Sequence, residues 1–345
     1  MSAHMTRRRF VSLTASLGTL STLAACAGTN EADTAATTDR EPSAAIVGSD
    51  AVTDKGDAAP AVYFVRTVDP DALVAVFNAL GRSLTGKIGV KLSSGEPGGN
   101  HYLHPELIAK LVDAVDGTIV ECNTAYEGGR STTEDHYRVA EEHGFTDIAD
   151  FQIMDEDGGM ELPVEGGFHL RQNQVGAHFA DYDGFLILSH FKGHMMAGFG
   201  GALKNVSIGM ASAAGKFRIH TSGASDTEWV NEVTPLFEES MADACQAVLA
   251  ARGDNMLYVN VMNNLSVDCD CDPNPAPPKM ADIGILASAD PVALDQACVD
   301  LVYASNDDSA DLIARIESLD GQHVLEAAEQ LGVGSRAYEL VEIEA

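Results

Sequence analysis

The fold is decided by residues 185–209, with the sequence F-L-I-L-S-H-F-K-G-H-M-M-A-G-F-G-G-A-L-K-N-V-S-I-G. The apolar segment Phe185–Phe191 is typical of a buried strand. In the run Gly193–Gly209, glycines let the backbone approach a ligand closely and expose its amide donors. This run carries a single lysine, Lys204, and burial lowers the pKa of an amine. We therefore predict an acid, a base or a nucleophile at this position.

Length and composition allow a large folded core. The chain has 345 residues, of which 45% are hydrophobic, and this fits one large domain or two lobes. The formal net charge is −31. Binding to nucleic acid needs a basic surface, so we exclude nucleic acid as a partner and expect a small-molecule ligand.

Strand-like and helix-like segments alternate along the chain, which predicts an α/β fold with a largely parallel sheet flanked by helices. We expect an N-terminal lobe at 61–235 and a C-terminal lobe at 236–345, with a cleft at the carboxyl ends of the strands. We expect the folded part to start near 61–65, and the expected strands are 87–92, 118–123, 185–191, 257–261 and 282–288. The expected helices are 105–115, 131–144 with a capping box at Ser131–Glu134, 230–251, and 290–304 capped by Asp290.

The first 26 residues have the layout of a signal segment. Arg7–Arg9 matches a twin-arginine export signal, and the apolar region that follows is too short to span a bilayer well. It ends in L-A-A-C, which resembles a lipobox with Cys26 as the lipidated residue. An uncleaved membrane anchor is the alternative. We expect export, anchoring of Cys26 to the outer face of the cytoplasmic membrane, and a disordered tether over 27–60.

Polar segments follow four of the expected strands. They are 93–100, 123–130, 190–204 and 263–272. In open parallel sheets, ligands bind beyond the carboxyl ends of the strands. We therefore expect the four segments to converge on one cleft.

The first candidate group combines lysines and histidines. We predict catalytic roles for Lys204, His194, His190 and Lys192, and a metal-ligating role for His220. The backbone of Gly200 and Gly201 would approach a cofactor. The alternative is that each histidine is a satisfied loop or core residue and that Lys204 pairs with an acid.

The second candidate group lies at 268–272, where two thiols and three carboxylates occur in five residues. Thiolates favour soft metals, and so much negative charge is costly without a cation. The predicted metal ligands here are Asp268, Cys269, Asp270 and Cys271, and Cys122 and Cys298 extend the set to four thiols for an iron–sulfur cluster. The alternatives are a disulfide that pairs Cys269 or Cys271 with Cys298 or Cys122, and an inert acidic turn.

The third candidate group lies on two further glycine-rich loops. Gly98 and Gly99 offer amide donors, and Asn123, Tyr126 and Arg130 offer side chains suited to a carboxylate or phosphate ligand. A pair of purely structural turns is the alternative.

Much of 61–342 resembles the prokaryotic family called domain of unknown function 362. The segments that carry the resemblance are 90–100, 121–126, 190–212, 263–272 and 290–298. Members are often described as iron–sulfur centre proteins, so the resemblance implies a metal centre.

A more distant resemblance is to nickel-pincer lactate racemases, and it rests on the spacing of His194, Lys204 and His220. It implies that the lysine is joined covalently to a nickel cofactor, that His220 coordinates nickel and that His194 moves a proton. The segment 123–130 also resembles a second racemase loop, but without its acid/base histidine. That difference argues against racemisation by the same two-base route.

Two classes of function follow. The first is a metal-dependent enzyme, either an oxidoreductase with a redox partner or a racemase-like isomerase. The second is a non-catalytic surface lipoprotein that binds a small anion or a metal ion.

Overall fold

The computed structural model describes residues 58–229 and 235–344. The expected signal segment, Cys26 and most of the expected tether lie outside these residues. None of the helices within 58–229 and 235–344 has the length and apolar character that crossing a membrane requires.

A sheet of eight strands forms the centre of the described chain, in the order β12-β1-β11-β10-β7-β2-β3-β4. Every strand in it is parallel to the others except β11, which is antiparallel to both neighbours. The strands are β1 (Ala61–Val65), β2 (Ile88–Lys91), β3 (Gly117–Glu121), β4 (Phe151–Ile153), β7 (Gly184–His190), β10 (Met256–Met262), β11 (Gly284–Ser288) and β12 (Glu339–Glu342). The predicted α/β class with a largely parallel sheet is confirmed.

Strands from both expected lobes pair in this one sheet. The apolar segment that opens the deciding stretch is β7, all of whose residues are buried, and it lies between β2 and β10. The boundary at 235/236 between two lobes stays a prediction.

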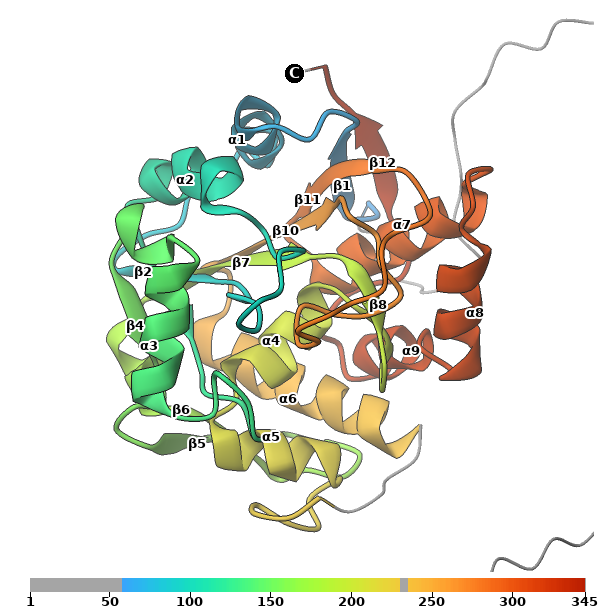
Figure 1. Cartoon of the computed structure of the whole chain (residues 1–345). Coiled ribbons are helices and arrows are strands. Elements are labelled where there is room, and N and C mark those ends of the chain that lie inside the picture. Colours follow the sequence, from blue (N-terminus) through green and yellow to red (C-terminus); the bar gives the residue numbers. More distant parts are fainter. Residues whose placement is uncertain (1–57, 230–234, 345) are drawn as a thin grey trace, which may run out of the picture. The chain divides into compact units, whose positions relative to one another are not determined.

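Helices cover both faces of the sheet (Figure 1). On one face lie α1 (Pro70–Ala79), α2 (Pro105–Ala114) and α3 (Thr133–Glu142), and their apolar side chains share a core with one side of the strands. A larger core on the other face includes side chains of α4 (Ala202–Met210), α5 (Ala213–His220), α6 (Leu236–Arg252), α7 (Pro291–Ala304), α8 (Ala310–Ser318) and α9 (His323–Gln330). Short 3-10 helices occur at Phe145–Asp147 and Ala177–Asp181, and β5 (Gly159–Pro163) pairs with β6 (Gln172–Gly176).

Two helix starts test the capping predictions. Asp290 caps α7 as expected, because its carboxylate accepts from the amides of Val292 and Ala293. At α3 the cap is one residue later than predicted. The Thr132 hydroxyl accepts from the Asp135 amide, which leaves Ser131 outside the helix.

The glycine-rich run folds into more structure than a loop. A short hairpin, β8 (Lys192–His194) with β9 (Gly198–Gly200), is followed directly by α4. Gly198 has a φ of 71° at the end of the turn, where a left-handed backbone favours glycine. The run therefore places His194 on a hairpin and Lys204 on a helix.

Candidate functional site

A cavity of about 190 Å³ lies beyond the carboxyl ends of the adjacent strands β10, β7, β2 and β3. Each of the four polar segments contributes to its wall. Ser93, Arg130, Lys204 and Cys269 are examples from the four segments in chain order. The parallel order of these strands brings the segments together, because their carboxyl ends meet at one edge of the sheet.

Helix α4 holds Lys204 at the cavity wall. The next residue, Asn205, fixes the helix to the sheet, because its amide donates to the Lys91 carbonyl at 3.1 Å and to the Ser189 hydroxyl at 3.1 Å. The Asn205 side-chain oxygen in turn accepts from the Lys91 amine at 3.1 Å. Asn205 therefore sets the position of Lys204 relative to β2 and β7.

The Lys204 amine has no hydrogen-bond or ion-pair partner among residues 58–229 and 235–344, although it lines the cavity. Burial lowers its pKa to about 7, and the positive charges of Lys192 and Lys91 add to this effect. A large fraction of the amine is therefore uncharged near neutral pH. An uncharged amine has the lone pair that a base or a nucleophile needs.

The backbone at the start of α4 packs closely against a carboxylate of this chain. Asp295 of α7 accepts from the amides of Ala202 at 2.8 Å and Leu203 at 2.9 Å. A Cβ on Gly201 would lie 2.4 Å from the Asp295 carboxylate. Gly200 and Gly201 line the cavity, and their role in binding a cofactor stays a prediction, whereas the amides of Ala202 and Leu203 at the helix start are bound to Asp295.

His220, at the end of α5, presents a lone pair to the cavity. Its Nδ1–H donates to the Lys216 carbonyl at 2.7 Å, so the neutral ring keeps its lone pair on Nε2. Burial lowers the pKa of His220 to about 4. The ring also stacks on Phe237, at 4.7 Å between ring centroids, which fixes its orientation. A neutral, oriented imidazole with a free Nε2 is suited to metal ligation.

His194 has the opposite arrangement. Its Nδ1 accepts from the amides of Met196 at 3.2 Å and Ala197 at 3.1 Å, so the proton of the neutral ring is on Nε2. Burial and the nearby Lys204 hold the pKa of His194 well below its usual range. In this arrangement the Nε2–H of His194 is available as a hydrogen-bond donor at the cavity wall.

Lys192 and His190 hold the loop that carries the two cysteines. Lys192 forms an ion pair with Asp270, and His190 Nδ1 lies 3.1 Å from the same carboxylate. His190 Nε2–H donates to the Asn263 carbonyl at 2.6 Å. Both side chains line the cavity, but their polar groups are already engaged, and although burial of the carboxyl opposes it, Lys192 with the contact to His190 holds the pKa of Asp270 below its usual range. We therefore interpret His190 and Lys192, predicted as catalytic, as positioning residues.

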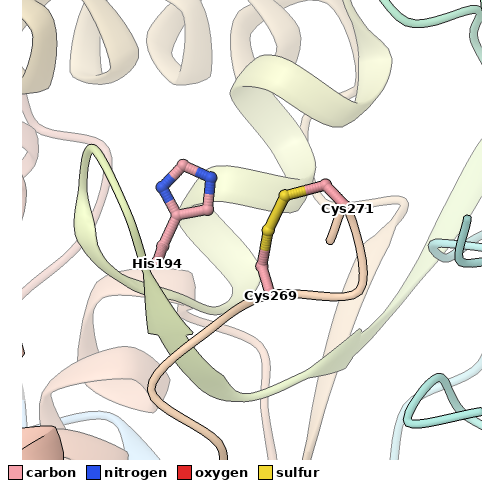
Figure 2. A group of neighbouring side chains, drawn as sticks. All are labelled: His194, Cys269 and Cys271. Carbon is pink, nitrogen blue, oxygen red and sulfur yellow. A yellow bond between two sulfur atoms is a disulfide. The ribbon is translucent and has the colours of Figure 1, made fainter. Parts of the chain in front are cut away.

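Cys269 and Cys271 form a disulfide at the cavity wall. This pairing differs from the predicted alternatives, in which either residue would pair with Cys298 or Cys122. The ligand atoms of His194, Cys269 and Cys271 lie within 4.8 Å of one another (Figure 2). The described chain therefore contains a His/Cys/Cys cluster that matches part of the predicted metal site.

The facing wall consists of a closed network of buried charges. Glu121 at the end of β3 accepts from Lys91 at 2.9 Å and from Arg130 at 3.3 Å. Arg130 also donates to Glu96 at 2.9 Å, and Tyr126 donates to Glu96 at 2.7 Å. The cations hold the pKa of Glu121 well below its usual range. Each buried charged group of this network stays ionised because it has an oppositely charged partner.

Some predicted residues lie away from the cavity. Asp268 pairs with Arg315, Asn123 bonds to Asp155 and Thr133, and Gly99 donates to the Glu96 carbonyl in a turn next to Gly98. Cys298 is buried in α7, where its sulfur accepts from Asn260. Cys122 lines the cavity, but burial raises its pKa to about 12. The structure therefore does not assemble the predicted four-cysteine cluster.

Sequence reasoning missed several residues that line the cavity, including Lys91, Glu121, Asn205, Lys216 and Trp229. Lys91 and Glu121 end two parallel strands, and this position is the signal that would have identified them. Four cations besides the largely uncharged Lys204 line the cavity, namely Lys91, Lys192, Lys216 and Arg130, against the carboxylates of Glu121 and Asp270 and that of Glu96, which pairs with Arg130. In a chain with a formal net charge of −31, this excess of positive charge favours an anionic ligand.

The family model for a domain of unknown function, DUF362, matches residues 88–300. This chain belongs to the DUF362 family. The matched range includes all four polar segments and both helices that carry Lys204 and His220. No curated protein is significantly similar to this DUF362 chain.

Two solved structures are similar to this DUF362 chain at low identity. One is the lactate racemase apoprotein of Thermoanaerobacterium thermosaccharolyticum, with 14% identity, a TM-score of 0.39, and coverage of 59% of this chain and 50% of the racemase. The other is a protein of Thermotoga maritima, with 13% identity, a TM-score of 0.38, and coverage of 76% and 58%. This chain therefore spans little more than half of either structure.

Proposed function

We propose that this chain is an enzyme that holds a metal or a metal-containing cofactor in the cavity and performs acid/base chemistry on a small organic anion. The observation that carries the proposal is Lys204, a partly buried amine at the cavity wall without a partner in the described chain and with a pKa of about 7. A charged amine in this place would be expensive, so a structural role explains it poorly.

Two side chains fit such a cofactor. The uncharged amine of Lys204 is able to form a covalent bond with it, and the Nε2 lone pair of His220 is able to ligate its metal. When bound, a metal would stabilise negative charge that develops on the substrate. The spacing of His194, Lys204 and His220 favours a nickel-type cofactor over the iron–sulfur cluster, whose predicted cysteines are not assembled.

The remaining residues of the wall would bind and orient the substrate. The net positive charge of the lining side chains would attract an anionic group, and His194 Nε2–H supplies a hydrogen-bond donor. Because the pKa of Lys204 is about 7, its amine accepts a proton above that pH and holds one below it.

The test is elemental analysis with a visible absorption spectrum on the full chain purified without oxygen. We expect a stoichiometric metal in the wild type and its loss in Lys204→Ala, with thermal unfolding of the variant no lower than that of the metal-free wild type. Lys110→Ala is the matched control, because Lys110 pairs with Asp71 where both side chains are more than half exposed. Equal metal content and spectrum in the wild type and Lys204→Ala would contradict the proposal.

The second candidate is a binding lipoprotein without chemistry, and the excess of cations in the cavity favours it. Metal-free native protein that still binds a small carboxylate or phosphate, measured by calorimetry, would support this function instead.

We also propose that the protein is exported and anchored through Cys26, because residues 1–26 have the layout of a twin-arginine lipoprotein signal. Cell fractionation tests this proposal. Cys26→Ala should release the protein from the membrane fraction, and no change would contradict the anchoring. A redox partner belongs to the proposal only for an oxidoreductase, and reduction of the native protein by chemical donors would test it.

A further inference from the structure

We propose that Cys269 and Cys271 form a redox-active pair that exchanges with small-molecule thiols, with His194 as the hydrogen-bond donor to the leaving sulfur. This activity is separate from the proposed acid/base function and needs no metal cofactor. It rests on the position of the disulfide in the cavity wall and on the groups around it.

A purely structural disulfide is a poor explanation for this pair. The two residues are separated by two positions, so the bond closes a very short loop. The stabilisation that a disulfide gives by restricting the unfolded chain grows with the length of the loop that it closes. The loop is also held without the bond, because the Asp270 side chain binds Lys192 and His190 and its carbonyl accepts from the Glu96 amide.

The pair is accessible from the cavity. Both cysteines line the cavity. Cys269 is buried, with 7% exposure, whereas Cys271 is partly exposed. The three other cysteines within the described chain, Cys122, Cys245 and Cys298, are buried and unpaired. A small thiol that enters the cavity therefore meets the sulfur of Cys271 first.

His194 is oriented for the departing sulfur. Its Nδ1 is occupied by two backbone amides, and the ring directs Nε2 toward the sulfur atoms (Figure 2). The nitrogen and both sulfurs lie within 4.8 Å of one another. An N–H donor at this place stabilises negative charge on the sulfur that leaves.

The exchange consists of two successive attacks by small-molecule thiolates. One thiolate attacks Sγ of Cys271 and forms a mixed disulfide, and the Cys269 sulfur leaves with the bonding electron pair and takes a proton. A second thiolate attacks the small-molecule sulfur of the mixed disulfide and releases Cys271, which takes the other proton. Two small thiols become one small disulfide, and the protein disulfide gains two electrons and two protons.

The experiment uses the full chain and one peptide. Cleavage after Arg252 and Lys279 gives a peptide, 253–279, in which Cys269 and Cys271 are the only cysteines. The protein is denatured in iodoacetamide, either directly or after native treatment with 2-mercaptoethanol and removal of the thiol. We expect no adducts on this peptide without the thiol and two adducts after it.

Two results would overturn the proposal. Two adducts without any thiol would show free or metal-bound cysteines in place of a disulfide. No adducts after native thiol treatment would show that the pair does not exchange. Neither result tests the chemistry of Lys204 or metal binding at His220, so the proposed function is tested independently of this proposal.

The role of His194 is tested by the rate of reduction. His194→Phe keeps a ring of similar size without a donor, and we expect reduction by 2-mercaptoethanol to be about fivefold slower, as for the loss of one hydrogen bond. His194→Gln keeps an N–H donor and should recover most of the rate. Rescue by glutamine would separate a donor role from an effect of packing, because glutamine does not restore the packing of the ring. Equal rates in the wild type and His194→Phe would overturn the role of His194.

Discussion

Two walls of the cavity differ in whether their titratable side chains have partners. On the wall formed by the ends of β2 and β3, Lys91 and Arg130 both pair with Glu121, so each cation has a carboxylate partner. On the wall formed by α4 and α5, the Lys204 amine has no partner in the described chain, and His220 keeps one nitrogen free. The paired wall stabilises the fold, whereas the unpaired wall keeps lone pairs available for chemistry.

The largest effect on stability is expected from breaking the paired wall. Glu121→Ala leaves Lys91 and Arg130 buried without their shared carboxylate, so the free energy of unfolding should fall by about 3–5 kcal/mol. Chemical denaturation measures this loss. Glu342→Ala is the control, because Glu342 pairs with Arg66 at the surface, where the loss should stay below about 1 kcal/mol. Equal losses for the two variants would contradict the contrast.

The same wall predicts an acid dependence. The pKa of Glu121 is well below 4.5, so its contribution to stability is complete above that pH and is lost as the pH falls through the folded-state pKa. The difference in stability between the wild type and Glu121→Ala should therefore shrink on acidification, as measured by thermal unfolding at pH 7 and pH 3. A constant difference would contradict the ion pairing of Glu121.

The unpaired wall should lose affinity rather than stability. His220→Phe keeps a ring to stack on Phe237 but removes the free nitrogen, so metal affinity should fall at least about tenfold. Metal titration of the apoprotein measures the change. His178→Phe is the control, because His178 pairs with Asp181 and does not line the cavity. If His220→Phe binds metal as tightly as the wild type, His220 is not a ligand.

The smallest effect is a gain in stability at the unpaired wall. Lys204→Met removes the cost of burying a charge, so stability should rise by about 1 kcal/mol at pH 7. The pKa of Lys204 is about 7 in the folded chain against 10.5 for an ordinary lysine, so the wild type gains stability as the pH rises between these values. The advantage of Lys204→Met should therefore be smaller at pH 9.5 than at pH 7, as measured by thermal unfolding. Lys110→Met, at an exposed lysine, should show no such trend.

Much of the fold followed from local patterns. The apolar segments predicted strands that became β2, β3, β7, β10 and β11, because strands buried on both faces of a sheet need continuous apolar side chains. The short pairs β5–β6 and β8–β9 were missed, because their sequences lack an apolar period and their pairing depends on neighbouring segments.

The candidate site was predicted in outline but not in its roles. Residue type marked Lys204, His194 and His220 as candidates, and all three line the cavity. The same reasoning marked His190 and Lys192 as catalytic, whereas the structure engages both with Asp270. A side chain becomes reactive when its partners are absent, and partners from distant segments are invisible in a sequence.

The sequence by itself determined the α/β class, the family and the four polar segments that form the cavity, because strand periodicity and motif spacing are local properties of the chain. Only the tertiary structure decided which nitrogen of each histidine is free, which lysine lacks a carboxylate and which cysteines bond to each other. These properties depend on hydrogen-bond partners that the folded sheet brings together from distant segments, as it does for His190 and Asp270, which are 80 residues apart.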